Sequence, residues 1–491
     1  MTQTPGLGAR QPGRAAPPGK RLLLVVLCAV QFIDAYDIAA MVPALPKIQR
    51  YLGMSPDALQ WVVTAYVLGY GGFLLLGGRL ADLFDRKRLL IGSVLVFAAA
   101  SAVGGVVTAG WVLIAARLAK GITAAFTAPA SLAILLHTHE EGEARNKALG
   151  AYLSIAAVGF TSGLVLGGLL AAVTWRLVLL IPAALALIAA ITAARVIPPG
   201  QRGAGQQRQP VDMLGALTVT AGLMALVYGV SRASASGWGD SLTIGSLAAS
   251  VVLLAAFVQA QRVRRVPLVP LRIFTRPGLA RANTAMFLLQ GSYVGWQFTA
   301  TLYLQNVDHW SPVAVGLVFA PGGPMVVLTA QRWAARTGRT GAWPIALAGV
   351  TLMLLGYLWT LALGQLNSVL VFTIATVVMG TGYAMSYPAT NITAVAGARP
   401  EEQGLASGLF VASFQVGSGV ILGIVASVLT TGIHSGVSAY RLAVTATAAA
   451  AALAVLTCAT GLMTRRPAAG TPDPGVPGQR EQQPADKAPS C

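Results

Sequence analysis

Two acidic residues, Asp34 and Asp37, stand three positions apart inside a long apolar run near the start of the chain. A charged side chain in the lipid core costs at least about 2.5–3.5 kcal/mol, so acids in such places are usually functional. Residues three apart on a helix share one face, and two carboxyls that face a common cavity titrate as a coupled pair. Their chemistry predicts a group that takes up and releases protons.

Two basic residues, Arg117 and Lys120, lie within another apolar run with the same spacing. At about 1.5 Å of rise per residue, Asp34 and Lys120 lie near the middle of the membrane, with Asp37 and Arg117 slightly further out. Matching depths predict the pairs Asp37–Arg117 and Asp34–Lys120. Arg117 stays charged, whereas a buried lysine can lose its proton, so Lys120 is a further candidate for titration. The alternative is that the acids only neutralise the two cations.

The composition shows which elements must hold these charges. Of the 491 residues, 55% are hydrophobic and 10% are charged, whereas soluble chains carry about 25% charged residues. Most of the chain must therefore lie in lipid, where about 20 apolar residues cross the bilayer as a helix. We predict an all-α integral membrane protein with about fourteen spans, near residues 21–45, 59–80, 89–109, 111–136, 148–173, 176–197, 212–231, 243–262, 281–304, 312–334, 343–363, 367–395, 403–430 and 438–463.

The spans fall into groups of six, two and six. This grouping predicts two six-helix bundles, at residues 21–200 and 276–463, joined by an inserted helix pair within 201–275. The ends, 1–20 and 464–491, are rich in Pro and Gly and are predicted to be disordered. The net charge of +18 lies mostly in alternate loops, which follows the positive-inside rule rather than a nucleic-acid surface. Both termini are therefore expected on the cytoplasmic side of the cell inner (cytoplasmic) membrane.

Other function classes lack their signatures. The sequence contains no G-x-x-x-x-G-K-[ST] loop for a nucleotide. The three cysteines show no pairing pattern, and none of the four histidines has a convincing metal-ligand context. We therefore expect no metal, no cofactor and no enzymatic activity.

Four motifs in order along the chain resemble the major facilitator superfamily, in its fourteen-helix drug/proton antiporter branch. They are an inner-loop signature similar to G-x-L-a-D-r-x-G-r-k at 78–88, a motif similar to R-x-x-Q-G-x-g-a-A at 117–125, an antiporter signature similar to g-x-x-x-G-P-x-x-G-G at 159–168, and an aspartate followed by Ala-Leu-Pro at 37–46. The resemblance covers about residues 21–463. It implies the major facilitator fold and marks Asp37 as the leading proton-coupling residue. Asp34, which has no counterpart at its position in the family, is a candidate with Arg117 and Lys120 because of their depth in the membrane.

The resemblance also implies a conformational latch at the inner face. Its residues are Gly78, Asp82, Arg86, Lys87 and Arg88. Asp82 and Arg86 are four residues apart beside a helix end, which suits a salt bridge that breaks when the two halves move. The alternative is that the basic residues only set the topology.

The third motif implies an antiporter helix whose glycines are Gly159, Gly163, Gly167 and Gly168. Glycines that recur every fourth residue let a neighbouring helix approach closely, and plain helix packing is the alternative reading. Three residues depart from the family pattern: Asp85 replaces Gly, Lys120 replaces Gln, and Leu164 replaces Pro, which removes a kink-forming residue.

Polar and aromatic side chains in the later spans predict a substrate cavity. Polar groups facing lipid would be unsatisfied, and aromatic walls with few polar groups suit a greasy, drug-like ligand. Hydrogen bonding between helices is the alternative reading. The predicted substrate-binding residues are Gln290, Tyr293, Gln297, Tyr387, Asn391, Phe414 and Gln415.

These features predict a monomeric, proton-coupled antiporter that exports a drug, antibiotic or other amphiphilic small molecule by alternating access. Its partners are the small-molecule substrate, protons and the lipid bilayer, with no nucleic acid. One alternative is a proton-coupled symporter that imports a small metabolite, and the glycine signature favours export over it. The other is a non-transporting membrane sensor, in which the paired buried acids have no role.

The alternation of basic loops predicts the position of two segments. Reporter domains fused after residue 205 and after residue 480 should both fluoresce in the cytoplasm, and neither position should support alkaline phosphatase activity. A fusion after residue 240, in a predicted outer loop, is the control and should give the opposite pattern. Phosphatase activity at residue 205 or 480 would contradict the predicted topology.

Overall fold

The computed structural model describes residues 18–139, 143–198, 212–264, 267–396, 402–431 and 436–463. Of the predicted disordered ends, 1–20 and 464–491, all but residues 18–20 lie outside this description, and those three begin the first helix. The described residues form fifteen α-helices and one short 3-10 helix. The predicted all-α fold is confirmed.

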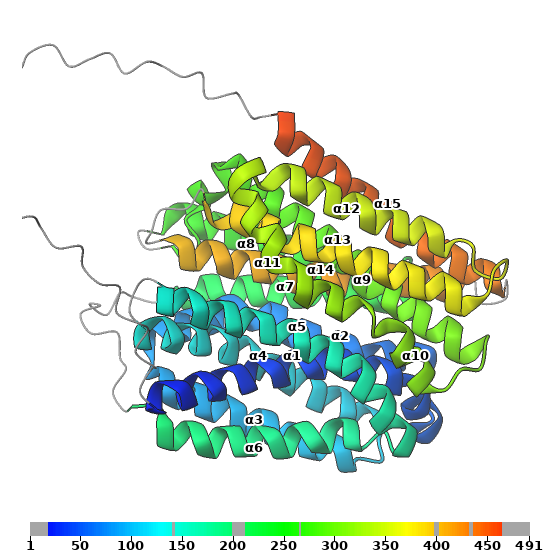
Figure 1. Ribbon diagram of the computed structural model, residues 1–491, viewed down its shortest axis with the longest axis horizontal. Helices are drawn as coiled ribbons and strands as arrows, with labels where there is room; N and C mark the ends of the chain where they lie inside the picture. The colour runs from blue at the N-terminus through cyan, green and yellow to red at the C-terminus, as the bar shows by residue number, and fades with distance from the viewer. Residues whose placement is uncertain are drawn as a thin grey trace, which may run out of the picture.

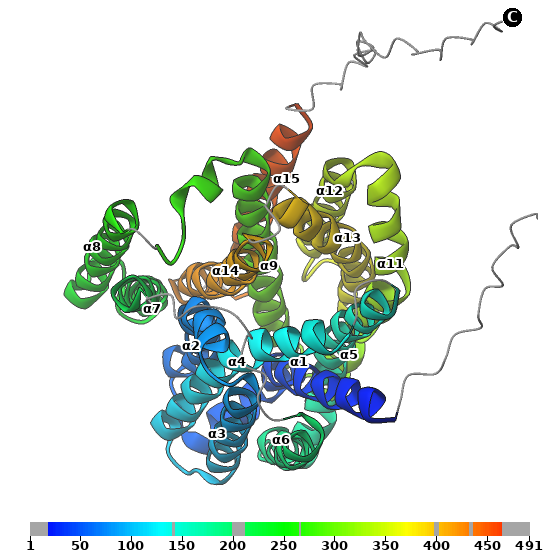
Figure 2. The same ribbon diagram turned by 90° about the vertical axis from the view of Figure 1, so that its left-hand side faces the viewer.

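The first six helices form one group, as Figure 2 shows. Within it, α1 packs on α5, α2 on α4, and α3 on both α4 and α6. Sequence patterns at the termini explain some of the boundaries: Ser55 caps the start of α2 and Asp85 caps the start of α3. The helices are α1 (Pro18–Leu52), α2 (Pro56–Leu83), α3 (Arg86–Val106), α4 (Gly110–Thr138), α5 (Glu143–Val173) and α6 (Leu177–Val196).

The last seven helices form a second group, which follows the 3-10 helix η1 (Leu271–Thr275). In this group α9 packs on α14 and α15, and α13 packs on α11 and α12. The helices are α9 (Pro277–Asn306), α10 (Pro312–Phe319), α11 (Gly322–Thr340), α12 (Ala342–Thr360), α13 (Ser368–Ala396), α14 (Gln403–Thr431) and α15 (Val437–Met463).

The predicted span 312–334 is wrong in one respect, because it is two helices rather than one. The break falls at Ala320 and Pro321, between α10 and α11. A proline has no N–H to donate to the preceding turn, so it ends the regular hydrogen-bond ladder. The next residue, Gly322, then lies against Gly380 of α13, where a Cβ added to Gly380 would be 2.6 Å from the Gly322 carbonyl oxygen.

The inserted pair, α7 (Met213–Ser236) and α8 (Ser241–Val263), lies at one side of the two groups (Figure 2). The first of them, α7, contacts α2 of one group and α14 of the other. Its partner α8 buries Thr243, Ser250 and Phe257, a stripe that recurs every seven residues, so most of its surface faces outward. A hydrogen bond of 2.7 Å from Gln261 to Asp212 ties the end of α8 to the start of α7.

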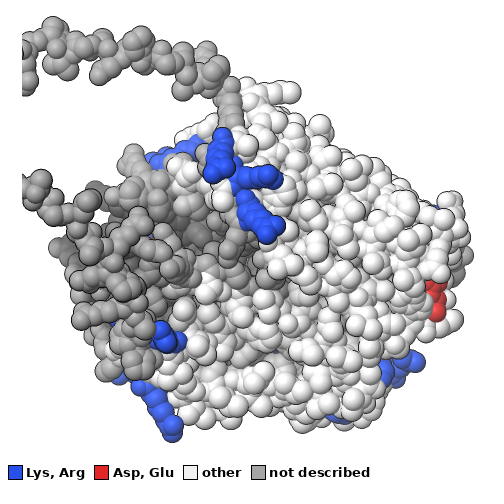
Figure 3. All heavy atoms as spheres, in the orientation of Figure 1, with Lys and Arg blue, Asp and Glu red and all other residues white. Residues whose placement is uncertain are grey.

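Length and hydropathy support a membrane location for this bundle. Ten of the described helices are long and apolar enough to span a bilayer, and shorter apolar stretches lie in α2, in α5 and across α10 and α11. The remaining predicted span, 281–304, is α9, which carries buried polar residues such as Gln290 and Gln297. On the face in Figure 3 the charged side chains of the described residues lie toward the two ends of the helices. Figure 1 shows that α1 begins and α15 ends at the same end of the bundle.

One apolar cluster joins the two groups at the end of the bundle away from these termini. It includes Leu45 of α1 and Leu59 of α2 together with Phe298 of α9 and Val425 of α14. A hydrogen bond of 3.2 Å from Gln305 to the Pro43 carbonyl oxygen adds a polar contact beside it. The two groups are therefore closed against each other at this end.

The glycines of α5 lie where other helices come closest. A Cβ added to Gly159, Gly163 or Gly167 would be 2.5–2.7 Å from a carbonyl oxygen of α1, and one added to Gly168 would be 2.4 Å from the Pro312 oxygen of α10. Three glycines therefore pack α5 within the first group, and the fourth packs it against the second. Their predicted role in antiport remains a prediction.

This packing predicts the effect of adding one methyl group. The variant Gly167→Ala should lower the thermal unfolding midpoint in detergent, because its Cβ would meet the backbone of Ala40, and such overpacking costs about 1–3 kcal/mol. The control Gly92→Ala, on α3, has no atom within 4 Å of the added Cβ and should leave the midpoint unchanged or slightly raised. Equal midpoints for the two variants would contradict the packing.

Candidate functional site

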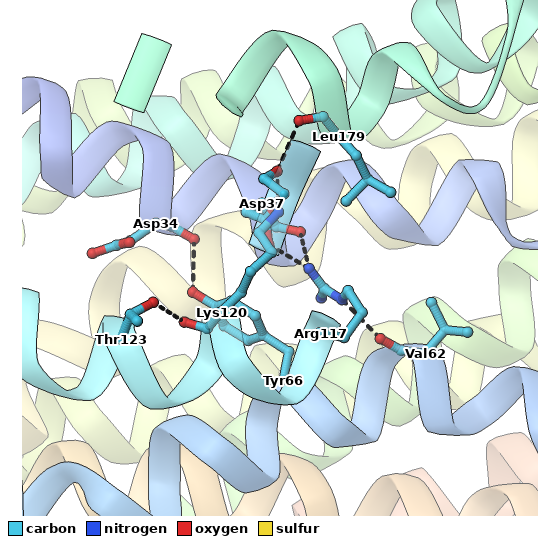
Figure 4. Close-up of polar contacts among 9 residues, drawn as sticks. Asp34, Asp37, Val62, Tyr66, Arg117, Lys120, Thr123 and Leu179 are labelled. Atoms are coloured by element: carbon cyan, nitrogen blue, oxygen red, sulfur yellow. Dashed lines mark hydrogen bonds and ion pairs between the residues drawn. The ribbon is translucent and has the colours of Figure 1, made fainter. Parts of the chain in front are cut away.

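A cluster of three charged side chains lies between α1 and α4 (Figure 4). Arg117 donates a hydrogen bond to one carboxylate oxygen of Asp37, and Lys120 donates to the other. None of the three residues is more than 1% exposed. The predicted Asp37–Arg117 pair is confirmed, and both oxygens of this carboxylate have a cationic partner.

The predicted Asp34–Lys120 pair is wrong, since Lys120 pairs with Asp37 instead. Side chains on a helix lean toward the N-terminus of that helix. Because α1 and α4 run in opposite directions, Asp34 and Lys120 lean away from each other. Lys120 therefore reaches Asp37, and Thr127, two turns further along α4, reaches Asp34.

Arg117 is fixed by contacts on α2 as well as by Asp37. Its Nε donates to the Val62 carbonyl oxygen at 2.8 Å, and its guanidinium lies over the Tyr66 ring, 4.5 Å from the ring centre. A guanidinium over an aromatic face is attracted by the ring quadrupole, most strongly when water is absent. The position of Arg117 is thus set by α1 and α2 together.

Lys120 is fixed in the same way on α3. Its Nζ donates to the Ser101 hydroxyl at 2.7 Å and lies 4.5 Å from the centre of the Phe97 ring. Ser101 in turn donates to the Leu179 carbonyl oxygen of α6 at 2.8 Å. Ser101 is not among the predicted site residues, although a serine inside an apolar run is a signal of a buried polar contact. The charged cluster therefore connects five helices of the first group.

Asp34 has different surroundings. Its carboxylate accepts a hydrogen bond of 2.7 Å from the Thr127 hydroxyl, and it makes no ion pair within the described residues. Figure 4 shows its carboxyl directed away from Asp37, while its carbonyl oxygen accepts a bond of 3.4 Å from the Tyr66 hydroxyl. Asp34 is 4% exposed. It is thus a buried carboxyl with a neutral partner, and Thr127 was missed by the sequence analysis.

The predicted latch lies at the turn between α2 and α3. The side chain of Asp82 lies outside the description, so its pairing with Arg86 remains a prediction. Asp85, which departs from the family pattern, accepts a bond of 3.0 Å from the Arg88 backbone N–H and caps α3. Lys87 donates to the Ile197 carbonyl oxygen at 2.5 Å, which ties this turn to the end of α6.

Four of the predicted substrate-binding residues meet in one cluster of the second group. Tyr383 donates a hydrogen bond of 3.0 Å to Gln290, and its ring centre lies 5.5 Å from that of Tyr293 and 5.6 Å from that of Tyr387. Tyr387 also contacts Phe414, at 6.3 Å between ring centres. These residues come from α9, α13 and α14, and we call Tyr293, Tyr383, Tyr387 and Phe414 the aromatic wall.

The aromatic wall reaches the first group through Phe160 of α5, whose ring centre lies 6.4 Å from that of Tyr293. Phe160 is not among the predicted site residues. Gln415 is buried where α14 passes α2, and a Cβ added to Gly71 there would lie 3.1 Å from the Gln415 Cβ. The predicted residues of α9 and α14 thus lie near the boundary between the two groups.

The two remaining predicted residues are placed differently. Gln297 is 3% exposed, and its Nε2 finds no hydrogen-bond partner in the described part of the chain. Asn391 is half-buried on α13, one turn beyond Tyr387, and makes none of the ring contacts. The structure therefore does not bring Asn391 into the aromatic wall.

Comparison with known proteins agrees with this architecture. The family model described as Major Facilitator Superfamily matches residues 27–422. The cephamycin export protein of Amycolatopsis lactamdurans is 34% identical over 440 residues, which are 87% of this chain and 88% of that protein. The tetracenomycin C resistance and export protein of Streptomyces glaucescens is 30% identical, with 85% and 76% covered. The puromycin resistance protein of Streptomyces alboniger is 38% identical, with 64% and 62% covered.

Solved structures show the same fold at low sequence identity. A variant of the nucleoside transporter NupG has a TM-score of 0.63 at 13% identity, covering 90% of this chain and 99% of that one. A bacterial homologue of the human lysosomal transporter Spinster has a TM-score of 0.64 at 14% identity, covering 91% and 99%. Both similarities concern the fold alone.

The two carboxyls should differ in their effect on stability. Asp37→Asn leaves Arg117 and Lys120 as neighbouring buried cations without an anion, and breaking a buried ion pair costs about 3–5 kcal/mol. We expect a lower membrane yield and a lower unfolding midpoint in detergent. Asp34→Asn is the matched control, because it disturbs only the contact with a neutral hydroxyl, and it should lower both by much less.

Adding Lys120→Gln to Asp37→Asn should recover part of the loss, since one of the two unpaired cations is then removed. The described contacts would be contradicted if Asp34→Asn were as damaging as Asp37→Asn.

Proposed function

This chain belongs to the Major Facilitator Superfamily, and from that premise we propose that it exports an antibiotic or drug-like small molecule in exchange for protons. Three relatives support the cargo class, since their names describe export of cephamycin, export of and resistance to tetracenomycin C, and resistance to puromycin. The proposed location is the cytoplasmic membrane, with both termini in the cytoplasm, and the proposed working unit is a monomer.

The observation that carries the proton coupling is the pair of buried carboxyls on α1. Asp34 and Asp37 are 4% and 1% exposed and lie inside a helix that is apolar enough to span the membrane. A carrier driven by protons needs a group that binds a proton on one side and releases it on the other. Acids buried at this depth are otherwise expensive, so their presence favours such a role.

The aromatic wall supports a greasy cargo. Its rings come from three helices of the second group, and Gln290 supplies a polar group among them. Pockets for drug-like ligands are mostly apolar and aromatic, with a few polar groups that fix orientation. Phe160 connects this wall to the helix that packs along α1, so the cargo site and the carboxyls lie on opposite sides of one boundary between the groups.

Alternating access would follow from opening and closing that boundary. The groups are packed together at the end away from the termini through Leu45, Phe298 and their neighbours. In the proposed cycle they separate there, release the cargo and accept a proton. They then close and release the proton on the side of the termini.

The sign of the response to a proton gradient tests this proposal against its alternatives. Purified protein in proteoliposomes should concentrate ethidium or puromycin inside when the lumen is acidic, because an antiporter exchanges luminal protons for external cargo. Addition of nigericin, which collapses the gradient, should abolish the accumulation. A symporter would instead concentrate its substrate when the lumen is alkaline, and a sensor would give no flux in either case.

The same assay tests the aromatic wall. Tyr387→Ala should raise the half-saturating probe concentration about tenfold, because it removes one aromatic ring from the face offered to the cargo, and such a ring contact is worth about 0.5–1.5 kcal/mol. The control Trp111→Ala removes an aromatic ring that is 73% exposed at the start of α4 and should leave the concentration unchanged. Equal values for the two variants would place the cargo elsewhere.

A further inference from the structure

We infer that Asp34, and not Asp37, is the carboxyl that exchanges its proton during transport, while Asp37 stays ionised as the counter-ion of Arg117 and Lys120. The inference rests on the proposed proton antiport and names the residue that performs it. It departs from the family resemblance, which marks Asp37. The contacts of the two carboxyls carry it.

Asp37 has no freedom to accept a proton in this arrangement. One of its oxygens accepts from Arg117 and the other from Lys120. A proton on Asp37 would remove the negative charge that both cations face, and both cations are almost completely buried. Protonated Asp37 would leave Arg117 and Lys120 without a carboxylate partner, and buried cations without a partner are strongly destabilising.

Asp34 can change its charge without breaking an ion pair. Its bond from Thr127 survives protonation, because a carboxylic acid still has an oxygen that accepts from a hydroxyl. When Asp34 is ionised, the two acids balance Arg117 and Lys120. When it is protonated, the four groups carry one positive charge. A proton on Asp34 therefore switches the net charge of the site and leaves the Asp37 cluster intact.

The tyrosines that face Asp34 do not compete for this role. Tyr66 and Tyr70 approach it from α2, Tyr152 from α5, and Lys120 from α4, while Asp37 is its neighbour on α1. Tyrosines remain neutral over the physiological range. Two other helices packed on α1 carry their cations near their ends, at Arg195 of α6 and Arg281 of α9.

Lys120 is the reason that Asp37 serves as a counter-ion while Asp34 exchanges the proton. Asp37 with Arg117 alone would be a neutral pair, and a proton on Asp37 would leave one buried cation. Lys120 adds a second cation to the same carboxylate, so that a proton on Asp37 would leave two buried cations unpaired. The excess charge that Lys120 brings is balanced by Asp34, one turn along α1. Lys120 is also one of the positions at which this chain departs from the family pattern.

A polar route leads from Asp34 toward the end of the bundle that holds the termini. Gln31, one turn closer to that end of α1, is half-buried and accepts a hydrogen bond of 2.6 Å from Tyr152 of α5. Asp34, Gln31 and Tyr152 thus place polar atoms of α1 and α5 in sequence along the helix axis. The cations around Asp37 lie on the other side of Asp34.

Carbodiimide labelling tests the inference on the unaltered full-length protein. Dicyclohexylcarbodiimide modifies carboxyls that are protonated in apolar surroundings, and mass spectrometry locates the adduct. The adduct should form on Asp34, should decline as the pH is raised, and should be absent from Asp37. An adduct on Asp37 with none on Asp34 would overturn the inference.

A second test uses variants in proteoliposomes with ethidium as the probe. Asp34→Asn should lose acceleration by an acidic lumen and should no longer release protons when ethidium binds in weakly buffered detergent. Exchange of ethidium between compartments of equal pH should keep at least half of the wild-type rate. Asp34→Glu should restore both responses, which a purely structural role for the residue would not explain.

The control for this test is Asp240→Asn, which removes a carboxyl from the turn before α8, where asparagine is an equally good helix cap. It should behave as the wild type in both assays. If Asp34→Asn also kept gradient acceleration and proton release, the inference would fail while proton antiport stood. If the wild-type protein itself showed neither response, the proposed function would fail.

Discussion

The contact on which the rest of the first helix group depends is the ion cluster of Asp37, Arg117 and Lys120. Three charges at no more than 1% exposure require hydrogen-bond partners in place of water. The neighbouring helices meet this requirement, since Val62, Ser101 and the Tyr66 and Phe97 rings all face the two cations. The charges thereby fix the relative positions of α1, α2, α3 and α4.

The polar contacts between these helices also require that the helix backbones lie close together. Short polar bonds between helices are available only if the axes come near each other, and Gly121 of α4 lies so close to α2 that a Cβ there would be 2.0 Å from the Tyr66 carbonyl oxygen. Gly159, Gly163 and Gly167 of α5 likewise bring α1 close, at 2.5–2.7 Å between an added Cβ and a carbonyl oxygen of α1. In a membrane, where lipid tails are as apolar as leucine, such packing is a main source of helix association. Small residues and buried charges thus both contribute to holding these helices together.

The sequence was sufficient for the number of spans, the deep placement of Asp34 and Asp37, and the Asp37–Arg117 pair, because apolar run length and helical rise determine depth. The sequence did not predict the partners of Asp34 and Lys120, because depth in the membrane does not reveal the direction in which side chains lean on antiparallel helices. That direction brings Lys120 into contact with Asp37 and Thr127 into contact with Asp34. The break at Pro321 was readable from the proline itself. The meeting of Phe160 with Tyr293 was not, since no local pattern relates helices from different groups.

Two opposing contributions to the free energy meet at the boundary between the two helix groups. Tyr36 Oη of α1 and Gln297 Nε2 and Thr301 Oγ1 of α9 are buried without a hydrogen-bond partner among the described residues. An unsatisfied buried polar group costs about 1–3 kcal/mol, whereas the apolar contacts of Leu45, Phe298 and Val425 favour closure at the same end. Opening would hydrate the polar atoms and expose the apolar ones. The polar atoms and the apolar contacts at this boundary therefore favour opposite arrangements of the two groups.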